Sequence, residues 1–207
     1  MGHRPLRGVG ARSTESWVGA GTRVAMASAM RSWRRYLRGN LRGAEADART
    51  CLELATEASW AVFNPLAAAV LSGVLLERGE LDEARSVFAP FEVFGNDDDF
   101  GFVQLLHVKE AELALARGDG EGALDRLALC RRFELGWGEN PGIACAVDWR
   151  SPAALANLAV DRRSEARALA EDQVQLARSF GVARWLAPAL RVLGGVERDR
   201  RALDALE

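Results

Sequence analysis

His107 and Glu110 have side chains of a type and spacing that could hold a metal ion. They stand three positions apart, so a helix would carry both on one face. The other histidine, His3, falls in a start expected to be unstructured, and a zinc or iron site needs further ligands nearby. We therefore interpret His107 as a helix-face histidine partly covered by its neighbours, and we predict no metal.

The acidic run from Asn96 to Gly101 could suggest a calcium loop. With Asn96 as position one, Gly101 falls at position six, as such a loop requires. Position five is then Phe100, and position twelve is His107 where a bidentate glutamate is needed. We interpret the run as a solvated acidic loop.

Phosphate-binding and nucleophilic chemistry find little support. The glycine-rich run 118–122 follows an expected helix, not a strand, and lacks the dinucleotide-binding spacing, so it is predicted to be a turn. The sole lysine, Lys109, follows Val108, which excludes a P-loop. No nucleophile elbow is present in the sequence. We predict no enzyme and no cofactor; catalysis would require a further domain to supply the chemistry.

The cysteines and tryptophans are best explained by packing. Three cysteines without paired spacing argue against a disulfide framework and for a reducing compartment. Cys51 and Cys130 are predicted to be buried packing residues. Trp137 and Trp149 could line a ligand groove, but we favour their sealing the gap between helix pairs.

Composition suits one domain or a repeat array. The 207 residues are 49% hydrophobic and 27% charged, with a formal net charge of −2, which gives no support for a nucleic-acid-binding surface. Residues 1–42 nevertheless hold nine arginines and one acid, Glu15. We favour a disordered Arg-rich leader over 1–20, with a transit peptide as the alternative. Without an apolar run long enough for a membrane span or signal peptide, a cytoplasmic setting is expected.

A short sequence motif recurs along the chain at a period near 40 residues. It consists of a helix end, a glycine, a polar turn and an alanine five residues beyond the glycine. The glycines are 40 and 39 positions apart, and a fourth copy with aspartate in place of glycine follows after 43. The pairs are Gly39 and Ala44, Gly79 and Ala84, Gly118 and Ala123, and Asp161 and Ala166.

This period predicts an all-α chain, an α-solenoid of four to five helix hairpins over 21–195 with a charged stub at 196–207. Glycine ends a helix because it adopts positive φ without a Cβ clash. Helices joined by a short turn cross closely, and only a small side chain fits there. The recurring alanines are predicted to mark these crossings, and Cys51 and Cys130 lie seven positions after two of them.

The helical spacing of apolar residues and the residues typical of helix ends predict where the individual helices lie. The first helix is expected to bury a side containing Val24, Met26, Ala27, Met30, Trp33 and Leu37. Asn64-Pro65 and Ser151-Pro152 are read as an N-cap followed by proline at the first helical position. The expected helices are 21–38, 41–58, 65–78, 81–91, 102–117, 120–134, 152–160, 164–180 and 182–193.

The recurring glycine–alanine motif resembles the tetratricopeptide repeat. It departs from that repeat in its longer period, against about 34 residues, and in Ser28, Ala68 and His107 where a bulky aromatic is usual. Over 36–195 the chain looks like the helical segment of large ATP-binding LuxR-type transcriptional regulators of MalT-like layout. The segments that carry this likeness are 38–48, 75–85, 140–142, 148–151 and 164–171.

The resemblance implies a non-catalytic sensing and interaction segment, which in that family lies between an ATPase and a helix-turn-helix. Neither of those flanking domains has a counterpart within these residues. We expect a protein segment or small effector to bind a concave face formed by 65–78, 102–117 and 152–160. The alternative is a free-standing tetratricopeptide adaptor. No direct nucleic-acid contact and no membrane partner are expected, and self-association through an open array end is anticipated.

Overall fold

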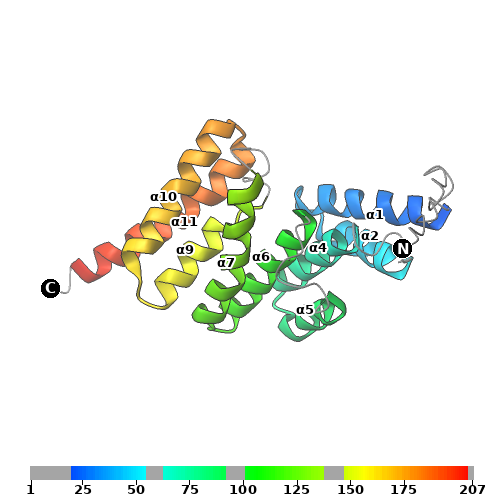
Figure 1. The fold of residues 1–207 in the computed structure, drawn as a ribbon, viewed down its shortest axis with the longest axis horizontal. Coiled ribbons are helices and arrows are strands. Elements are labelled where there is room, and N and C mark those ends of the chain that lie inside the picture. The colour runs from blue at the N-terminus through cyan, green and yellow to red at the C-terminus, as the bar shows by residue number, and fades with distance from the viewer. Residues whose placement is uncertain (1–19, 55–62, 92–100, 138–146, 205–207) are drawn as a thin grey trace, which may run out of the picture.

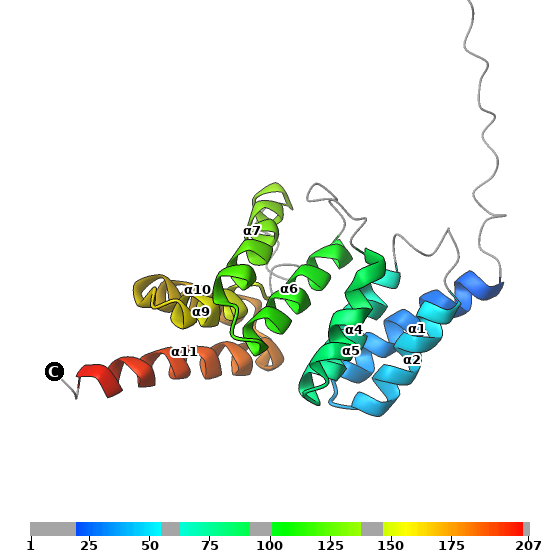
Figure 2. The same cartoon turned by 90° about the horizontal axis from the view of Figure 1, so that it is seen from below.

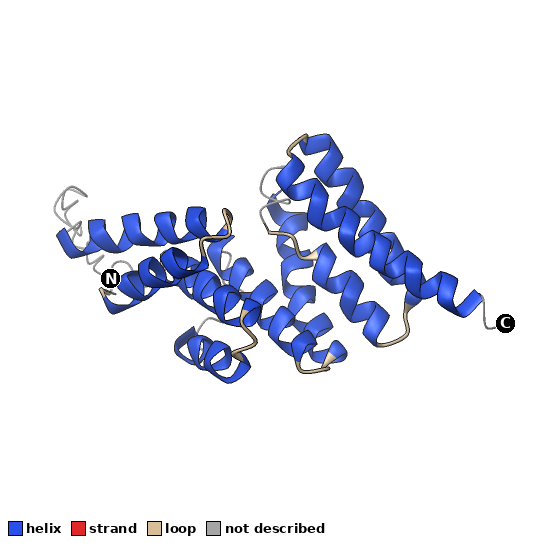
Figure 3. Cartoon of the chain, turned by 180° about the vertical axis from the view of Figure 1, so that it is seen from behind, coloured by secondary structure: helices blue, strands red, loops and turns tan. Residues whose placement is uncertain are grey.

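The protein is all-helical throughout the part that its computed structural model describes, which is 20–54, 63–91, 101–137 and 147–204 (Figures 1 and 3). No strand occurs in these ranges. The helices are α1 (Ala20–Tyr36), α2 (Leu41–Glu53), α4 (Asn64–Glu77), α5 (Leu81–Phe88) with a 3-10 turn η2 (Ala89–Phe91), α6 (Gly101–Ala116), α7 (Gly120–Trp137), α9 (Arg150–Ala159), α10 (Arg163–Phe180) and α11 (Ala183–Asp204).

The helices pair in chain order along the long axis of the molecule (Figures 1 and 2). α1 packs on α2, α4 on α5, α6 on α7, and α9 on α10. The first helix of each pair also contacts the first helix of the next, through α1, α4, α6 and α9. The second helices α2, α5 and α7 contact the following first helix as well, and α11 packs on α10 and α9.

Each of the four turns inside a pair has the same backbone geometry. Gly39, Gly79 and Gly118 have φ of 74°, 76° and 80°, and Asp161 has 62°. In every copy, the N–H of the next residue bonds to the carbonyl five positions back, at 2.8–3.0 Å: Asn40 to Arg35, Glu80 to Leu75, Asp119 to Ala114 and Arg162 to Asn157. This pattern caps the last carbonyls of the first helix. The prediction that Asp161 replaces a glycine in this turn is confirmed.

The recurring small residues are all fully buried. Ala44, Ala84, Ala123 and Ala166 have no exposed surface. Cys51 and Cys130 have none either. These positions therefore lie inside the helix contacts, as predicted from the sequence.

The buried face of α1 was predicted correctly for Trp33, which packs against the core, but wrongly for most of the other residues. Val24, Met26 and Met30 are 49%, 41% and 45% exposed. The buried residues are instead the small ones at helical spacing, namely Ala25, Ser28, Ala29 and Ser32. Small side chains let α1 approach α2 and α4 closely, and this contact outweighs the burial of larger residues on the other face.

Two helix starts also differ from the sequence reading. Asn64 is not a cap, because α4 already includes it and its side chain is buried next to Cys51. Ser151 lies in the first turn of α9 and is itself bonded by Asp148, whose carboxylate accepts from the Ser151 N–H at 3.0 Å and from its hydroxyl at 2.7 Å. The proline in each pair still occupies the first helical turn.

The last helix is longer than predicted. We predicted that this helix ends at 193 and that a charged stub begins at 196. In the structure, α11 continues through Gly194 and Gly195 to Asp204. Val196 is buried against α9 and α10, beside Ala154, Ala166 and Ala170, and this packing holds the helix together past Gly195.

Pro90 ends α5 in the short 3-10 turn, as expected. The leader was predicted over 1–20, but α1 already begins at Ala20, and the rest of the leader lies outside the described residues. The acidic loop was predicted from Asn96 to Gly101, but Gly101 begins α6, and 96–100 lie outside the described residues.

Substituting Gly79 by alanine tests the turn geometry. An added Cβ would meet no atom within 4 Å, so only the positive φ opposes it. We expect Gly79→Ala to lower the free energy of unfolding by about 1 kcal/mol. Gly194→Ala in α11, which is equally open, should raise it by roughly 0.5–1 kcal/mol. Urea denaturation of both variants measures the contrast, and equal effects would contradict the assigned turn.

Ala166 and Ala168 provide a matched test of the helix contacts, because both lie in α10 but only Ala166 is buried. Ala166→Leu should lower the free energy of unfolding by about 1–3 kcal/mol through overpacking. Ala168→Leu should change it by less than about 0.5 kcal/mol. A leucine tolerated at 166 as well as at 168 would show that the helices do not cross there.

Candidate interaction groove

A groove of about 700 Å³ lies between α5 and α7, over the C-terminal half of α6. We call it the α5–α7 groove. Its apolar floor consists of Phe88, Leu113 and Leu129, which are 6%, 7% and 7% exposed. Ala114 and Gly122 supply small side walls. The groove exists because α5 and α7 each pack on α6, one from either side.

The rim of the α5–α7 groove carries balanced charge. Three arginines, Arg85, Arg117 and Arg126, lie among three acids, Glu110, Asp119 and Asp125. The groove therefore has no net charge that would select a strongly anionic or cationic ligand.

Most of these rim charges already have partners. Arg117 bonds Asp82 at 2.6 Å, and Arg126 approaches Glu110 at 3.6 Å. Asp119 accepts from the Gly122 N–H at 2.8 Å. Arg85 and Asp125 are exposed and make no ion pair within the described residues, so one charge of each sign remains to meet a bound molecule.

His107 and Glu110 do meet, as their spacing predicted. His107 Nδ1 lies 3.3 Å from Glu110 Oε2, and the histidine is buried. Within the described ranges, no group of three or more His, Cys, Asp or Glu side chains is placed to hold a metal ion. The pair acts as a polar contact at the edge of the groove, where Glu110 also faces Arg126.

A polar cluster around Lys109 was not found from the sequence. Lys109 is only 13% exposed; its ammonium donates to Glu112 at 2.7 Å and lies 5.5 Å from the centre of the Tyr36 ring. Burial opposes its charge, but the Glu112 carboxylate and Tyr36 outweigh this and raise the pKa of Lys109. For Tyr36, burial disfavours the charged phenolate and so raises the pKa.

Gly73 makes room for this cluster. A Cβ on Gly73 would lie 2.9 Å from the Tyr36 hydroxyl, so glycine permits the ring to cross α4 toward Lys109. The contact joins α1, α4 and α6, and its role is structural. A glycine inside an otherwise apolar helix was the available sequence signal.

Trp149 packs as a sealing residue. It belongs to the main apolar core, with the Arg150 guanidinium 4.8 Å from its ring centre. Beside it, burial raises the pKa of Asp148, while the bonds from Ser151 oppose that shift. The side chain of Trp137 lies outside the described residues.

The expected concave face needs a correction. Every residue of α4 from Asn64 to Leu75 is buried, so the stretch 65–78 exposes almost nothing for a ligand to touch. A largely apolar helix packed by α1, α2, α5 and α6 has almost no free side. The α5–α7 groove lies instead between two second helices.

Compared with models of protein families, with curated proteins and with solved structures, the chain gives no match. Across the described helices, none combines the length and apolar character that crossing a membrane demands.

The two buried cysteines should resist thiol reagents until the protein unfolds. Burial raises the pKa of Cys51 to about 11 and that of Cys130 to about 12, so the thiolate is disfavoured in the fold. Because these pKa values are raised, the stability they contribute is present below about pH 8.5 and declines as pH rises toward 11 and 12.

The measurement uses dithiobis(nitrobenzoate) at pH 8 on a Cys145→Ser chain, which removes the third thiol. Labelling should follow the urea unfolding curve. Ala168→Cys, at an exposed position of α10, is the control and should react at once. Rapid labelling of folded Cys51 and Cys130 would disprove their burial.

Proposed function

We propose that this chain is a tetratricopeptide-like α-solenoid that binds a protein segment in the α5–α7 groove. We further propose that it is the sensing and interaction segment of a LuxR-type ATP-dependent transcriptional regulator. The first proposal draws on the geometry of the helices. The second rests on the sequence resemblance.

The recurrence of one hairpin four times carries the solenoid proposal. Each copy has the same positive-φ turn and the same buried alanine five residues later. Each of α2, α5 and α7 also packs on the first helix of the next pair, so each unit is in contact with its neighbour in the chain. Units that contact mainly their neighbours in order are what defines a repeat array.

A protein segment suits the α5–α7 groove better than a small effector. Phe88, Leu113 and Leu129 expose under a tenth of their surface, so a small ligand would gain little apolar contact. Arg85 and Asp125 are exposed on the rim and can pair with charges of both signs. A peptide supplies such charges at intervals, together with main-chain polar groups.

By resemblance, such binding would gate the ATPase and oligomerisation of a regulator. The competing proposal is an adaptor that holds proteins together without a transcriptional role. Reading the coding sequence on both sides separates them. An in-frame P-loop upstream and helix-turn-helix downstream would support the regulator, and their absence would favour the adaptor.

Filling the α5–α7 groove tests the binding proposal. Ala114 lines the groove, while Ala116 on the same helix is exposed and outside it. Peptides selected on the intact chain from a random display library are titrated calorimetrically. Ala114→Trp should weaken their binding by about tenfold or more, a loss of roughly 1.4 kcal/mol. Ala116→Trp should leave it unchanged.

Arg85→Glu adds a second arm to this experiment. Selected peptides with acidic residues should bind this variant more weakly, because the exposed Arg85 is available to pair with them. Thermal melting of each variant verifies that it is folded. Peptides that bind both tryptophan variants equally would refute the groove as the binding site.

A further inference from the structure

Arginines at the hairpin turns form a series of ion pairs between consecutive hairpins. Arg78 bonds Glu45 of α2 at 2.8 Å, Arg117 bonds Asp82 of α5 at 2.6 Å, and Arg162 bonds Glu121 of α7 at 2.7 Å. In each case the arginine adjoins the positive-φ residue of one turn, and the acid lies near the start of the second helix of the preceding hairpin. We call this series the turn-arginine ladder.

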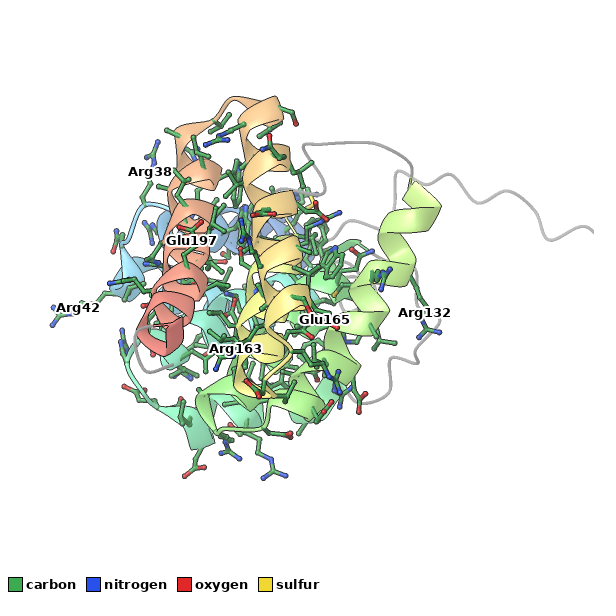
Figure 4. All side chains as sticks on the ribbon, turned by 90° about the vertical axis from the view of Figure 1, so that its left-hand side faces the viewer. Arg38, Arg42, Arg132, Arg163, Glu165 and Glu197 are labelled. Carbon is green, nitrogen blue, oxygen red and sulfur yellow. The ribbon has the colours of Figure 1, made fainter. Side chains whose placement is uncertain are left out.

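Arg38 occupies the corresponding place in the first hairpin. It precedes Gly39 just as Arg78 precedes Gly79 and Arg117 precedes Gly118. Arg38 is exposed and makes no ion pair among the described residues. Figure 4 shows Arg38 and Arg42 at one edge of the molecule and Arg132 at the opposite edge.

The outward side of α1 adjoins Arg38. Met26, Ala27, Met30, Arg34 and Arg38 follow one another at helical spacing, and we call them the α1 outer face. Met26 and Met30 are more than 40% exposed, and Arg34 is exposed beside them. Most of this face lines a hollow of about 400 Å³.

The charge of α1 is of one sign. The helix contains four arginines and no acid. Arg31 and Arg35 are already held by Asp47 of α2, at 2.7 and 2.8 Å. Arg34 and Arg38 remain available, so the α1 outer face offers two cations next to two exposed methionines.

We propose that the α1 outer face docks an acidic amphipathic helix of a partner protein. A carboxylate near the start of that helix bonds Arg38, as Asp82 bonds Arg117, and a second acid meets Arg34. Apolar residues on its inner side cover Met26 and Met30, whose flexible side chains adapt to varied partners. This surface is separate from the α5–α7 groove and adds a second binding site.

Charge argues against a second copy of this chain as the occupant. Pairing α1 with α1 would bring arginines against arginines. Docking onto the other end of the array would set α1 against α11, which carries five arginines and three acids. Both arrangements are repulsive, whereas an acidic helix is attracted.

The ladder also favours a protein carboxylate over a lipid surface. A basic amphipathic helix can lie on anionic membranes. In this chain, however, the two arginines equivalent in place to Arg38, Arg78 and Arg117, each bind a carboxylate on a helix. By analogy with these two positions, a helix carboxylate is the expected partner of Arg38.

Fluorescence anisotropy with the full chain tests the proposal. The probe is a synthetic helical peptide with leucines on one face and glutamates on the other, and its partner peptide has every glutamate replaced by glutamine. We expect the glutamate peptide to bind more tightly and its affinity to fall with added salt. Arg38→Glu should weaken it by about tenfold, as expected for losing a charge-assisted hydrogen bond.

Arg132→Glu is the matched control, since Arg132 is exposed on α7 at the far edge. Affinity retained in Arg132→Glu and in Ala114→Trp would support a site on α1 distinct from the α5–α7 groove. Equal binding by the Arg38→Glu variant would overturn the proposal. So would binding to phosphatidylserine vesicles without binding to the glutamate peptide, or sedimentation showing dimers that occlude the probe.

Discussion

The fold depends on how closely two helices can approach one another. At Ala44, Ala84, Ala123 and Ala166 the second helix of each pair presents no more than a methyl group to its partner. The positive-φ residue five positions earlier reverses the chain within a few residues and brings that alanine to the contact. One constraint on distance thus fixes turn, pairing and register together. This constraint acts within each helix pair. The same geometry therefore recurs wherever a positive-φ residue is followed, five positions later, by a buried alanine.

That constraint also determines where surface remains. Tight pairing places α4 among α1, α2, α5 and α6, so it becomes core along most of its length. The second helices α5 and α7 are instead separated by α6, and the α5–α7 groove opens between them. Its floor is buried and its rim charged, since the floor belongs to the core and the rim to solvent-facing helix sides. The binding surface is therefore a consequence of packing between hairpins.

Features set by local chemistry could be predicted from the sequence, and features set by distant contacts could not. Positive φ could be predicted at Gly39, Gly79 and Gly118 because glycine adopts it readily. Most helix bounds follow from the positions of these glycines. The face of α1 was misjudged because hydrophobicity favours Met26 and Met30, whereas close approach favours Ala25 and Ala29. The α5–α7 groove and the Lys109 cluster join residues from three helices, so no local pattern encodes them.

The turn-arginine ladder has a direction that the helix packing alone does not require. Exposed ion pairs of this kind contribute about 0–1 kcal/mol each, so apolar burial, not the ladder, stabilises the stack. What the pairs add is orientation, because a charge-assisted bond at each turn favours one placement of the next hairpin. Every arginine comes from the later hairpin and every acid from the earlier one. Within the described residues, Arg38 of the first hairpin therefore has no acid from a preceding hairpin to bind.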